Sequence, residues 1–387
     1  MITSILRLSI ERRGVMMLLA LFIAFFGMYS YNQLPIDAVP DITNVQVQIN
    51  TATPGYSPLE TEQRVTFVVE TSLAGLPNLS YTRSLSRYGL SQVTVVFEEG
   101  TDLYFARNLV NERLTAITAQ LPLGLTPKMG PIATGLGEIY MYSLSAEPTA
   151  RQENGKPYDA MALREIHDWV VKPQLALVSG VAEVYAIGGF EKQYHVNPNP
   201  LSMIHFGVGV DELISALERN NANQGAGFVE QNGQQVLVRS EAQLKGIEDI
   251  GQVTVKIIDS VPIKIKDIAS VNLGKELRSG AGTLKGEETV IGTAMMLVGE
   301  NSRSVAQAVG DKLEIIKASL PNGIILETVY DRTSLVDKAI DTVQKNLVEG
   351  ALLVIVVLFV LLGNVRAALI TAAVIPLAML ATIAGMV

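Results

Sequence analysis

The chain has 387 residues, 48% of them hydrophobic, a formal net charge of −8 and no cysteine. This composition favours a hybrid of membrane-spanning and extramembrane segments over a plain soluble enzyme or a wholly membrane-buried chain. Residues 37–346 carry 26 of the 30 Lys and Arg but 36 of the 38 Asp and Glu, and so acidic a segment is unsuited to nucleic acid.

The first predicted element is a membrane-spanning helix. An uncharged run of about 21 residues from Gly14 to Leu34 is long enough to cross the bilayer. A cleavable signal peptide is the alternative, but the apolar run continues through Tyr29 and Tyr31 to Leu34 without a small-residue cleavage site. We therefore expect an uncleaved span within residues 1–36.

Two further spans are predicted at the other end of the chain. One runs from about Leu347 to Val365, within a segment 333–365 that includes its lead-in, and the next occupies 366–387 with Pro376 inside it. Because this last span stops at Val387, we expect the chain to be the N-terminal part of a longer membrane protein.

The flanking charges predict the topology. Arg7, Arg12 and Arg13 adjoin the first span and Arg366 follows the second, so the positive-inside rule places these residues in the cytoplasm. Residues 37–346 then lie on the opposite side, which is the periplasm in a Gram-negative cell. The absence of cysteine is compatible with that oxidising compartment.

The first part of the outer segment reads as strand, helix, strand, strand, helix. Alternation at 45–50 predicts a strand, Ser57 with Glu60 predicts a capped helix start, and Gly75 predicts the end of that helix. Strands follow at about 79–86 and 91–97, and a helix at 103–121. This order is typical of the split βαβ, or ferredoxin-like, plan.

The same order recurs farther along, which favours a duplicated α+β unit. Its predicted elements are a strand at 138–145, a helix at 160–178, a strand after Gly180, a strand at 289–298 and a helix at 305–320. The intervening stretch reads as a β-rich insertion, with strand-like pieces at 193–196, 235–239, 253–257 and 261–265. Gly225-Ala226-Gly227 and Asn232-Gly233 predict a hairpin-like projection within it.

The candidate cation-binding residues are Glu138 and Asp168. Glu138 begins a strand beside Gly135 and Gly137, which permit close approach, and Zn²⁺ accepts carboxylate oxygen and imidazole nitrogen. Asp168 lies on the following helix beside His167. The alternative is that both acids are ordinary surface or salt-bridged charges.

Other possible ligands are weaker candidates. His195 and His205 each stand alone, and the Met16-Met17 and Met295-Met296 pairs lie in apolar elements where packing is the simpler explanation. Asp37 and Asp41 could attract cations or could only position the chain outside the bilayer.

Several ordered motifs resemble the heavy-metal branch of the resistance-nodulation-division (RND) efflux pumps, of the cobalt-zinc-cadmium type. The motifs are Leu34-Pro35-Ile36-Asp37-Ala38-Val39-Pro40-Asp41, Pro54-Gly55-Tyr56-Ser57-Pro58, Phe97-Glu98-Glu99-Gly100-Thr101-Asp102, Ala133-Thr134-Gly135-Leu136-Gly137-Glu138, Asp168-Trp169-Val170-Val171-Lys172-Pro173-Gln174 and Val329-Tyr330-Asp331-Arg332-Thr333.

The resemblance implies an α+β membrane protein with transmembrane helices flanking two ferredoxin-like periplasmic porter subdomains. These subdomains are expected at 37–132 and at 133–180 with 274–332, and a β-rich docking insertion at 181–273. In such pumps acidic residues at the positions of Glu138 and Asp168 form a periplasmic cation site. The Gly225-Ala226-Gly227 projection resembles the docking arm that reaches a neighbouring protomer.

The resemblance also implies the function and the partners. We expect a proton-driven exporter of Zn²⁺, Co²⁺, Ni²⁺ or Cd²⁺, not an enzyme and without a cofactor. It would work in the inner membrane as a homotrimer, with a periplasmic adaptor and an outer-membrane channel. The alternatives are an RND exporter of organic amphiphiles, to which the low aromatic content of 6% is ill suited, and a membrane-bound periplasmic sensor.

Overall fold

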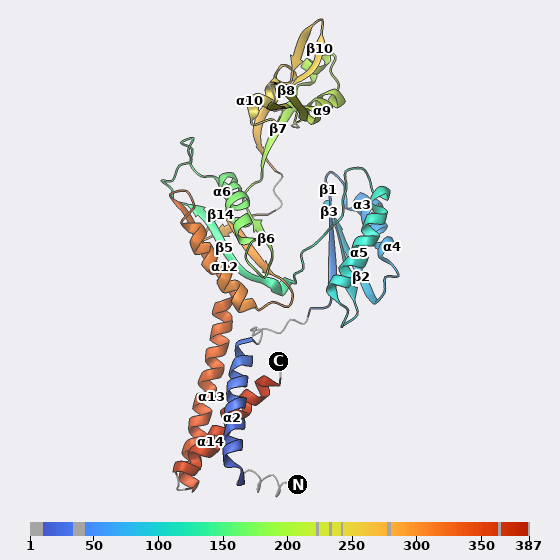
Figure 1. The fold of residues 1–387 in the computed structure, drawn as a ribbon. Coiled ribbons are helices and arrows are strands. Elements are labelled where there is room, and N and C mark those ends of the chain that lie inside the picture. Colours follow the sequence, from blue (N-terminus) through green and yellow to red (C-terminus); the bar gives the residue numbers. More distant parts are fainter. Residues whose placement is uncertain are drawn as a thin grey trace.

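The structure, a computed structural model, describes residues 11–33, 43–221, 224–231, 234–240, 243–276, 280–362 and 365–385. Figure 1 shows two bodies of helices and sheet, a third body inserted into the second, and long helices extending away from them. This mixed content agrees with the predicted combination of helices and sheets. Arg7, Asp37, Asp41 and Asn232-Gly233 lie outside the described residues.

The first body contains one antiparallel sheet with helices on one face. Its elements are β1 (Gln46–Thr53), α3 (Pro58–Thr61), α4 (Phe67–Leu73), β2 (Leu79–Arg87), β3 (Gly89–Phe97), α5 (Leu103–Ile117) and β4 (Lys128–Met129). The strands lie in the order β2-β3-β1-β4. Alternate residues of β1 and β3, such as Val47 and Val95, are buried against α4 and α5, so this face forms the core.

Local signals in the sequence set the helix ends of the first body. Ser57 accepts the backbone N–H of Glu60 while the Glu60 carboxylate accepts the N–H of Ser57, which is the predicted capping box. Gly75 has a φ of +75°, as expected where the chain leaves the helix. The predicted helix is present from 58 to 73, with a π-helical turn, Glu62–Thr66, inserted between α3 and α4.

The second body repeats this arrangement. Its elements are β5 (Glu138–Ala146), α6 (Ala160–Ile166), α7 (Lys172–Leu175), β6 (Val181–Ile187), β13 (Gly282–Leu284), β14 (Glu287–Met296), α12 (Ser302–Lys317) and β15 (Ile324–Asp331). β15, β5 and β14 are successive neighbours, and β14 pairs on its other side with β6 and β13. A π-helical turn, His167–Val171, again interrupts the first helix. The two bodies therefore share strand order as well as helix placement.

The inserted body lies between β6 and β13 and has its own core, which includes Met203, Leu213 and Ile265. Its elements are β7 (Lys192–Pro198), α8 (Pro200–Phe206), α9 (Val210–Arg219), β8 (Gln224–Gln231), β9 (Gln234–Ser240), α10 (Ile247–Gln252), β10 (Thr254–Ile258), β11 (Val261–Lys264), α11 (Ile265–Ile268) and β12 (Ala269–Lys275). The predicted strands are present, and Gly225-Ala226-Gly227 lies on β8.

The inserted body contains six strands, as a β-rich insertion should, and its described part also contains four short helices that the sequence analysis did not predict. The start of α8 was readable from the sequence. The Asn199 side chain accepts the N–H groups of Leu201 and Ser202, and Pro200 occupies the first helical position.

Three long helices extend from the bodies. They are α2 (Arg13–Gln33), α13 (Arg332–Leu362) and α14 (Val365–Ala384), and α2 and α14 lie beside the far half of α13 (Figure 1). Within the described residues, one segment, Arg13–Ser30, is both long and apolar enough to cross a bilayer. The helix that carries the second predicted span begins at Arg332, directly after β15, so the lead-in expected before Leu347 is helical as well.

Candidate functional site

Glu138 occupies the first position of β5, after a tight turn. The turn is a 3₁₀ turn, Gly135–Gly137, closed by the N–H of Gly137 donating to the carbonyl of Thr134 over 2.9 Å. A Cβ on Gly137 would lie 3.1 Å from the carbonyl oxygen of Met296. Glycine at position 137 thus allows β14 to approach this turn closely.

The Glu138 side chain lies on the face of the second sheet that carries no helix. Its Oε1 accepts a hydrogen bond of 2.6 Å from the hydroxyl of Tyr185 on β6. The preceding residue, Val184, is buried against the helices, so alternation along the strand directs Tyr185 to the opposite face. Burial, together with the bond to Glu138, raises the pKa of Tyr185 to about 12, so this hydroxyl remains a donor at neutral pH.

A second carboxylate lies in the same cross-strand row. Met295 on β14 is paired with Glu138 on one side and with Glu183 of β6 on the other. Residues directly opposite one another on neighbouring strands project to the same face. On the open face, the carboxylates of Glu138 and Glu183 therefore lie on either side of the Met295 thioether. The sequence analysis identified neither Tyr185 nor Glu183.

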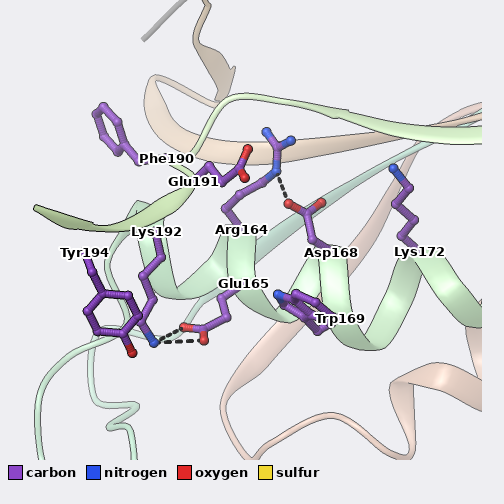
Figure 2. Close-up of a pocket in the computed structure, with 9 residues that line it drawn as sticks. All are labelled: Arg164, Glu165, Asp168, Trp169, Lys172, Phe190, Glu191, Lys192 and Tyr194. Carbon is purple, nitrogen blue, oxygen red and sulfur yellow. Dashed lines mark hydrogen bonds and ion pairs between the residues drawn. The ribbon is translucent and has the colours of Figure 1, made fainter. Parts of the chain in front are cut away.

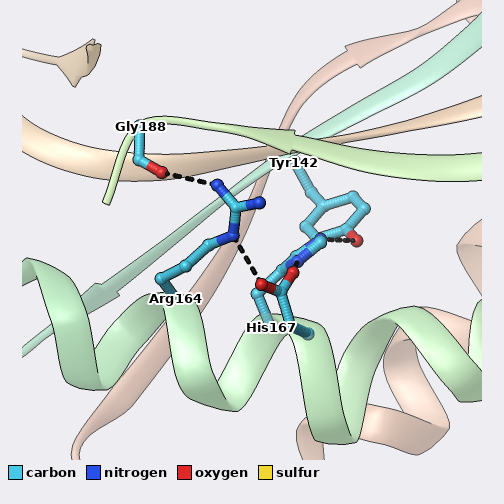
Figure 3. A network of polar contacts seen from close by, with 5 residues as sticks. Tyr142, Arg164, His167 and Gly188 are labelled. Atoms are coloured by element: carbon cyan, nitrogen blue, oxygen red, sulfur yellow. Dashed lines mark hydrogen bonds and ion pairs between the residues drawn. The ribbon is translucent and has the colours of Figure 1, made fainter. Parts of the chain in front are cut away.

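Asp168 lies in the helix layer of the second body, and both of its carboxylate oxygens are engaged. Oδ2 accepts from Nε of Arg164 over 2.7 Å, and Oδ1 lies 2.8 Å from Nδ1 of His167. On the far side of the ring, Nε2 of His167 lies 2.9 Å from the hydroxyl of Tyr142. Figure 3 shows this chain of contacts, which ends where Arg164 donates from Nη1 to the carbonyl of Gly188 over 3.1 Å.

The electrostatics of this network assign its protons. Burial lowers the pKa of His167 by more than the bond to Asp168 raises it. Burial raises the pKa of Asp168, but the bonds from His167 and Arg164 outweigh burial and hold it below its usual value. An ionised carboxylate can only accept, so Nδ1 of the neutral ring carries the hydrogen, and Nε2 accepts from Tyr142.

The structure does not bring Glu138 and Asp168 together. Asp168 belongs to the π-helical turn that covers the helix-bearing face, where its neighbour His167 contacts Tyr142. Glu138 bonds to Tyr185 on the opposite, open face. The sheet itself therefore separates the two predicted ligands.

Asp168 instead borders a groove between the second body and the start of the inserted body. Figure 2 shows its lining, which consists of charged and aromatic residues: Arg164, Glu165, Asp168, Trp169, Lys172, Phe190, Glu191, Lys192 and Tyr194. Lys192 is paired with Glu165 over 3.0 Å. Three acids and three bases in one lining give this groove no net preference for a cation.

Across the described part of the chain, no group of three or more His, Cys, Asp and Glu residues is arranged to hold a metal ion. Among the weaker candidates, Nε2 of His195 lies 3.2 Å from the amide oxygen of Gln193, and exposed His205 packs edge-on against Phe206. A protein zinc site takes three or four ligands, so Glu138 alone supplies an incomplete set.

Comparison with known proteins identifies the family. A model of the "AcrB/AcrD/AcrF family" matches residues 5–387. The chain is 56% identical to the cation efflux system protein CzcA of Alcaligenes sp. (strain CT14), over all of this chain and 36% of that protein. It is 45% identical to the nickel-cobalt-cadmium resistance protein NccA of Alcaligenes xylosoxydans xylosoxydans, covering 38% of it.

A solved structure agrees with these relatives. A crystal structure of a heavy metal efflux pump superposes with a TM-score of 0.88 and 32% identity, over 99% of this chain and 38% of that one. The chain thus spans somewhat over a third of the length of the proteins it resembles. On this evidence the chain belongs to the AcrB/AcrD/AcrF family of resistance-nodulation-division transporters.

Proposed function

We propose that this chain is part of a proton-driven exporter of divalent heavy-metal cations, with Zn²⁺, Co²⁺, Ni²⁺ or Cd²⁺ as cargo. The observation that carries the proposal is its 56% identity, over the whole chain, to a cation efflux protein. Transport requires no reacting nucleophile. It requires groups that bind the cargo in one conformation, together with a membrane-embedded group whose protonation favours one conformation.

We assign the open-face carboxylate of Glu138 to cargo binding. Carboxylate oxygen suits each of the four cations, and Tyr185 holds one oxygen of Glu138 in place. Glu183 projects from the same face, and further ligands would have to complete the set, because no described group of three His, Cys, Asp or Glu residues could hold a metal ion. Asp168 could contribute only after leaving Arg164 and His167, so in the conformation described it anchors the helix layer.

The architecture proposed for the whole protein follows from the fold. The shared strand order of the first and second bodies supports two ferredoxin-like porter subdomains, at 37–132 and at 133–180 with 274–332. The separate core of the inserted body supports a docking subdomain at 181–273. We assign α2, α13 and α14 to three membrane spans, within 1–36, 333–365 and 366–387.

Location and partners are proposed from family membership. The pump would lie in the inner membrane with its α+β bodies in the periplasm, as a homotrimer joined to a periplasmic adaptor and an outer-membrane channel. Protons would be the coupling ion. The proton-carrying residues would lie beyond this chain, since the predicted spans contain no interior Asp, Glu, Lys or His.

The similar proteins favour metal cargo over the two alternatives. The relatives and the solved structure named above are called cation efflux, metal resistance or heavy metal efflux proteins, which favours neither an exporter of organic amphiphiles nor a sensor. A metal-tolerance profile of a strain lacking the full-length protein tests the proposal. Poorer growth on one or more of the four cations, restored when the gene is returned, with unchanged sensitivity to organic dyes, supports it. Sensitivity to dyes alone refutes it.

A further inference from the structure

The long helix α13 is joined to the second sheet without a loop. Asp331, the last residue of β15, is paired with Tyr140 of β5, and the next residue, Arg332, begins the helix. Oδ1 of Asp331 accepts from the backbone N–H of Thr333 over 2.8 Å and from its hydroxyl over 2.6 Å. These bonds tie the first turn of α13 to the end of β15, so the helix and strand move together.

Arg332 also reaches back to the turn that precedes Glu138. Its side chain is buried, and Nη1 donates to the carbonyl oxygen of Leu136 over 3.0 Å. Leu136 is the central residue of the Gly135–Gly137 turn. A buried guanidinium needs its hydrogen bonds to offset the loss of water, so this contact is costly to break.

The same turn is held from its other side by β14. Gly137 lies close to Met296: a Cβ added at Gly137 would be 3.1 Å from the carbonyl oxygen of Met296, which is tighter than an ordinary contact. Met295, next to it, is paired with Glu138 itself. The turn therefore lies between β14 and Arg332, and a displacement of Arg332 must either move Leu136 or break the bond to it.

We propose that Arg332 is a positioning residue for cation binding, one that relays the position of α13 to the Glu138 carboxylate through the carbonyl of Leu136. The inference rests on the proposed function, in which Glu138 binds the cargo and α13 continues into the membrane. It adds a route by which a movement of that helix changes the geometry of the ligand: α13 shifts Arg332, Arg332 shifts the turn, and the turn sets the first residue of β5.

The matched control for Arg332 is Arg303. Arg303 on α12 also contacts α13, through an ion pair of 2.8 Å between its Nε and Oδ1 of Asp337, but this pair is about half exposed and does not touch the Glu138 turn. Removing the Arg303 side chain therefore perturbs the packing of α13 but keeps the hydrogen bond from Arg332 to the carbonyl of Leu136.

The test measures zinc affinity of the full-length protein by titration calorimetry in Arg332→Gln, Arg332→Lys and Arg303→Gln. Loss of an outer group that orients a metal ligand costs about ten- to a hundredfold in affinity, and this is the loss expected for Arg332→Gln. Arg332→Lys keeps a cationic donor and should recover part of that loss. Arg303→Gln should stay within about twofold, because exposed ion pairs contribute little.

A second readout does not depend on zinc. The chain has no cysteine of its own, so a Leu136→Cys substitution adds a unique alkylation site within it. Its labelling rate should rise several-fold when combined with Arg332→Gln and stay unchanged with Arg303→Gln. Equal labelling rates in the two double variants would show that Arg332 does not hold the turn.

The outcomes distinguish this inference from the proposed function. Normal zinc binding by the unmutated protein, with Arg332→Gln behaving like Arg303→Gln in both readouts, overturns the inference alone. Absence of zinc binding by the unmutated protein, and of binding by the other three cations, overturns the proposed function and this inference with it.

Discussion

The hydroxyl of Tyr185 donates a hydrogen bond of 2.6 Å to Oε1 of Glu138, joining β6 to β5 on the open face of the second sheet. The bond occupies one lone pair of one carboxylate oxygen and leaves the remaining lone pairs of the carboxylate available. A hydrogen-bond donor in this position fixes the orientation of a carboxylate and still leaves oxygen lone pairs free to bind a cation. In the proposed function, Tyr185 would therefore orient the Glu138 carboxylate for the cation.

The Tyr185→Phe variant should weaken cation binding about tenfold, because the carboxylate loses the donor that orients it. Equilibrium dialysis of the full-length protein against zinc measures the change. Tyr194→Phe is the matched control, since Tyr194 is an exposed tyrosine on the inserted body, in the groove that borders Asp168. Equal affinity in the two variants would contradict the role of Tyr185.

Asp168→Asn should destabilise the helix layer of the second body and leave cation affinity unchanged. The substitution removes the charge that holds Arg164 and His167, at a cost of about 1–3 kcal/mol in the free energy of local opening. Hydrogen exchange of amides in residues 160–176 measures that opening. Glu165→Gln breaks only a half-exposed pair with Lys192 and should cost under about 1 kcal/mol. A large loss of zinc affinity in Asp168→Asn would instead make Asp168 a ligand.

The stability of the second body should fall as the pH is lowered from 7 towards 5. Burial lowers the pKa of His167 in the folded state below the usual histidine value of about 6.5. Between these two values the unfolded chain binds a proton that the folded chain does not, so the free energy of unfolding decreases as the pH falls. Thermal unfolding of the full-length protein across this range measures the slope.

His167→Gln keeps a hydrogen-bonding side chain but does not titrate, so it should flatten that pH dependence. His205→Gln, which changes an exposed histidine on α8, should leave it as it is. A slope that is the same in all three proteins would refute the assignment to His167.

Gly188→Ala should disrupt the junction between the second body and the inserted body. Gly188 has a φ of +84°, and an added Cβ would lie 2.6 Å from both the backbone nitrogen of Gly282 and the carbonyl oxygen of Thr289. Gly155 has a similar φ of +78° with no atom within 4 Å of such a Cβ. Gly155→Ala should cost about 1 kcal/mol of backbone strain, whereas Gly188→Ala should cost about 1–3 kcal/mol more from overpacking.

Protease susceptibility of the junction at residues 188–191 measures the difference between the two glycine variants. Faster cleavage there in Gly188→Ala than in Gly155→Ala is the expected result. Equal cleavage would show that the junction has room for a side chain.

Elements with strong local signals were predictable from the sequence. The Ser57-Glu60 capping box, the turn at Gly75 and the alternating strand at 45–50 each depend on residues a few positions apart, and the structure confirms them. The repeated order of strands and helices followed from such signals. The helices α8 and α9 were missed, although Asn199-Pro200 marks the start of the first.

The environment of the candidate site could not be predicted in the same way. The pair Arg164 and Asp168 has the spacing of neighbours on one helix face, and this much was readable. The contacts of Tyr142 with His167, of Tyr185 with Glu138 and of Arg332 with Leu136 join residues 25, 47 and 196 positions apart. They depend on strand register and on helix placement over the sheet, which local patterns do not encode.

The central claim is that Glu138 binds the transported cation, and zinc titration of the full-length protein with Glu138→Gln tests it most directly. Glu327→Gln is the control, because it neutralises another carboxylate of the same sheet, one that is paired with Lys285. We predict that Glu138→Gln abolishes or greatly weakens one zinc site while Glu327→Gln keeps the unmutated affinity and stoichiometry. Unchanged stoichiometry and affinity in Glu138→Gln would contradict the account.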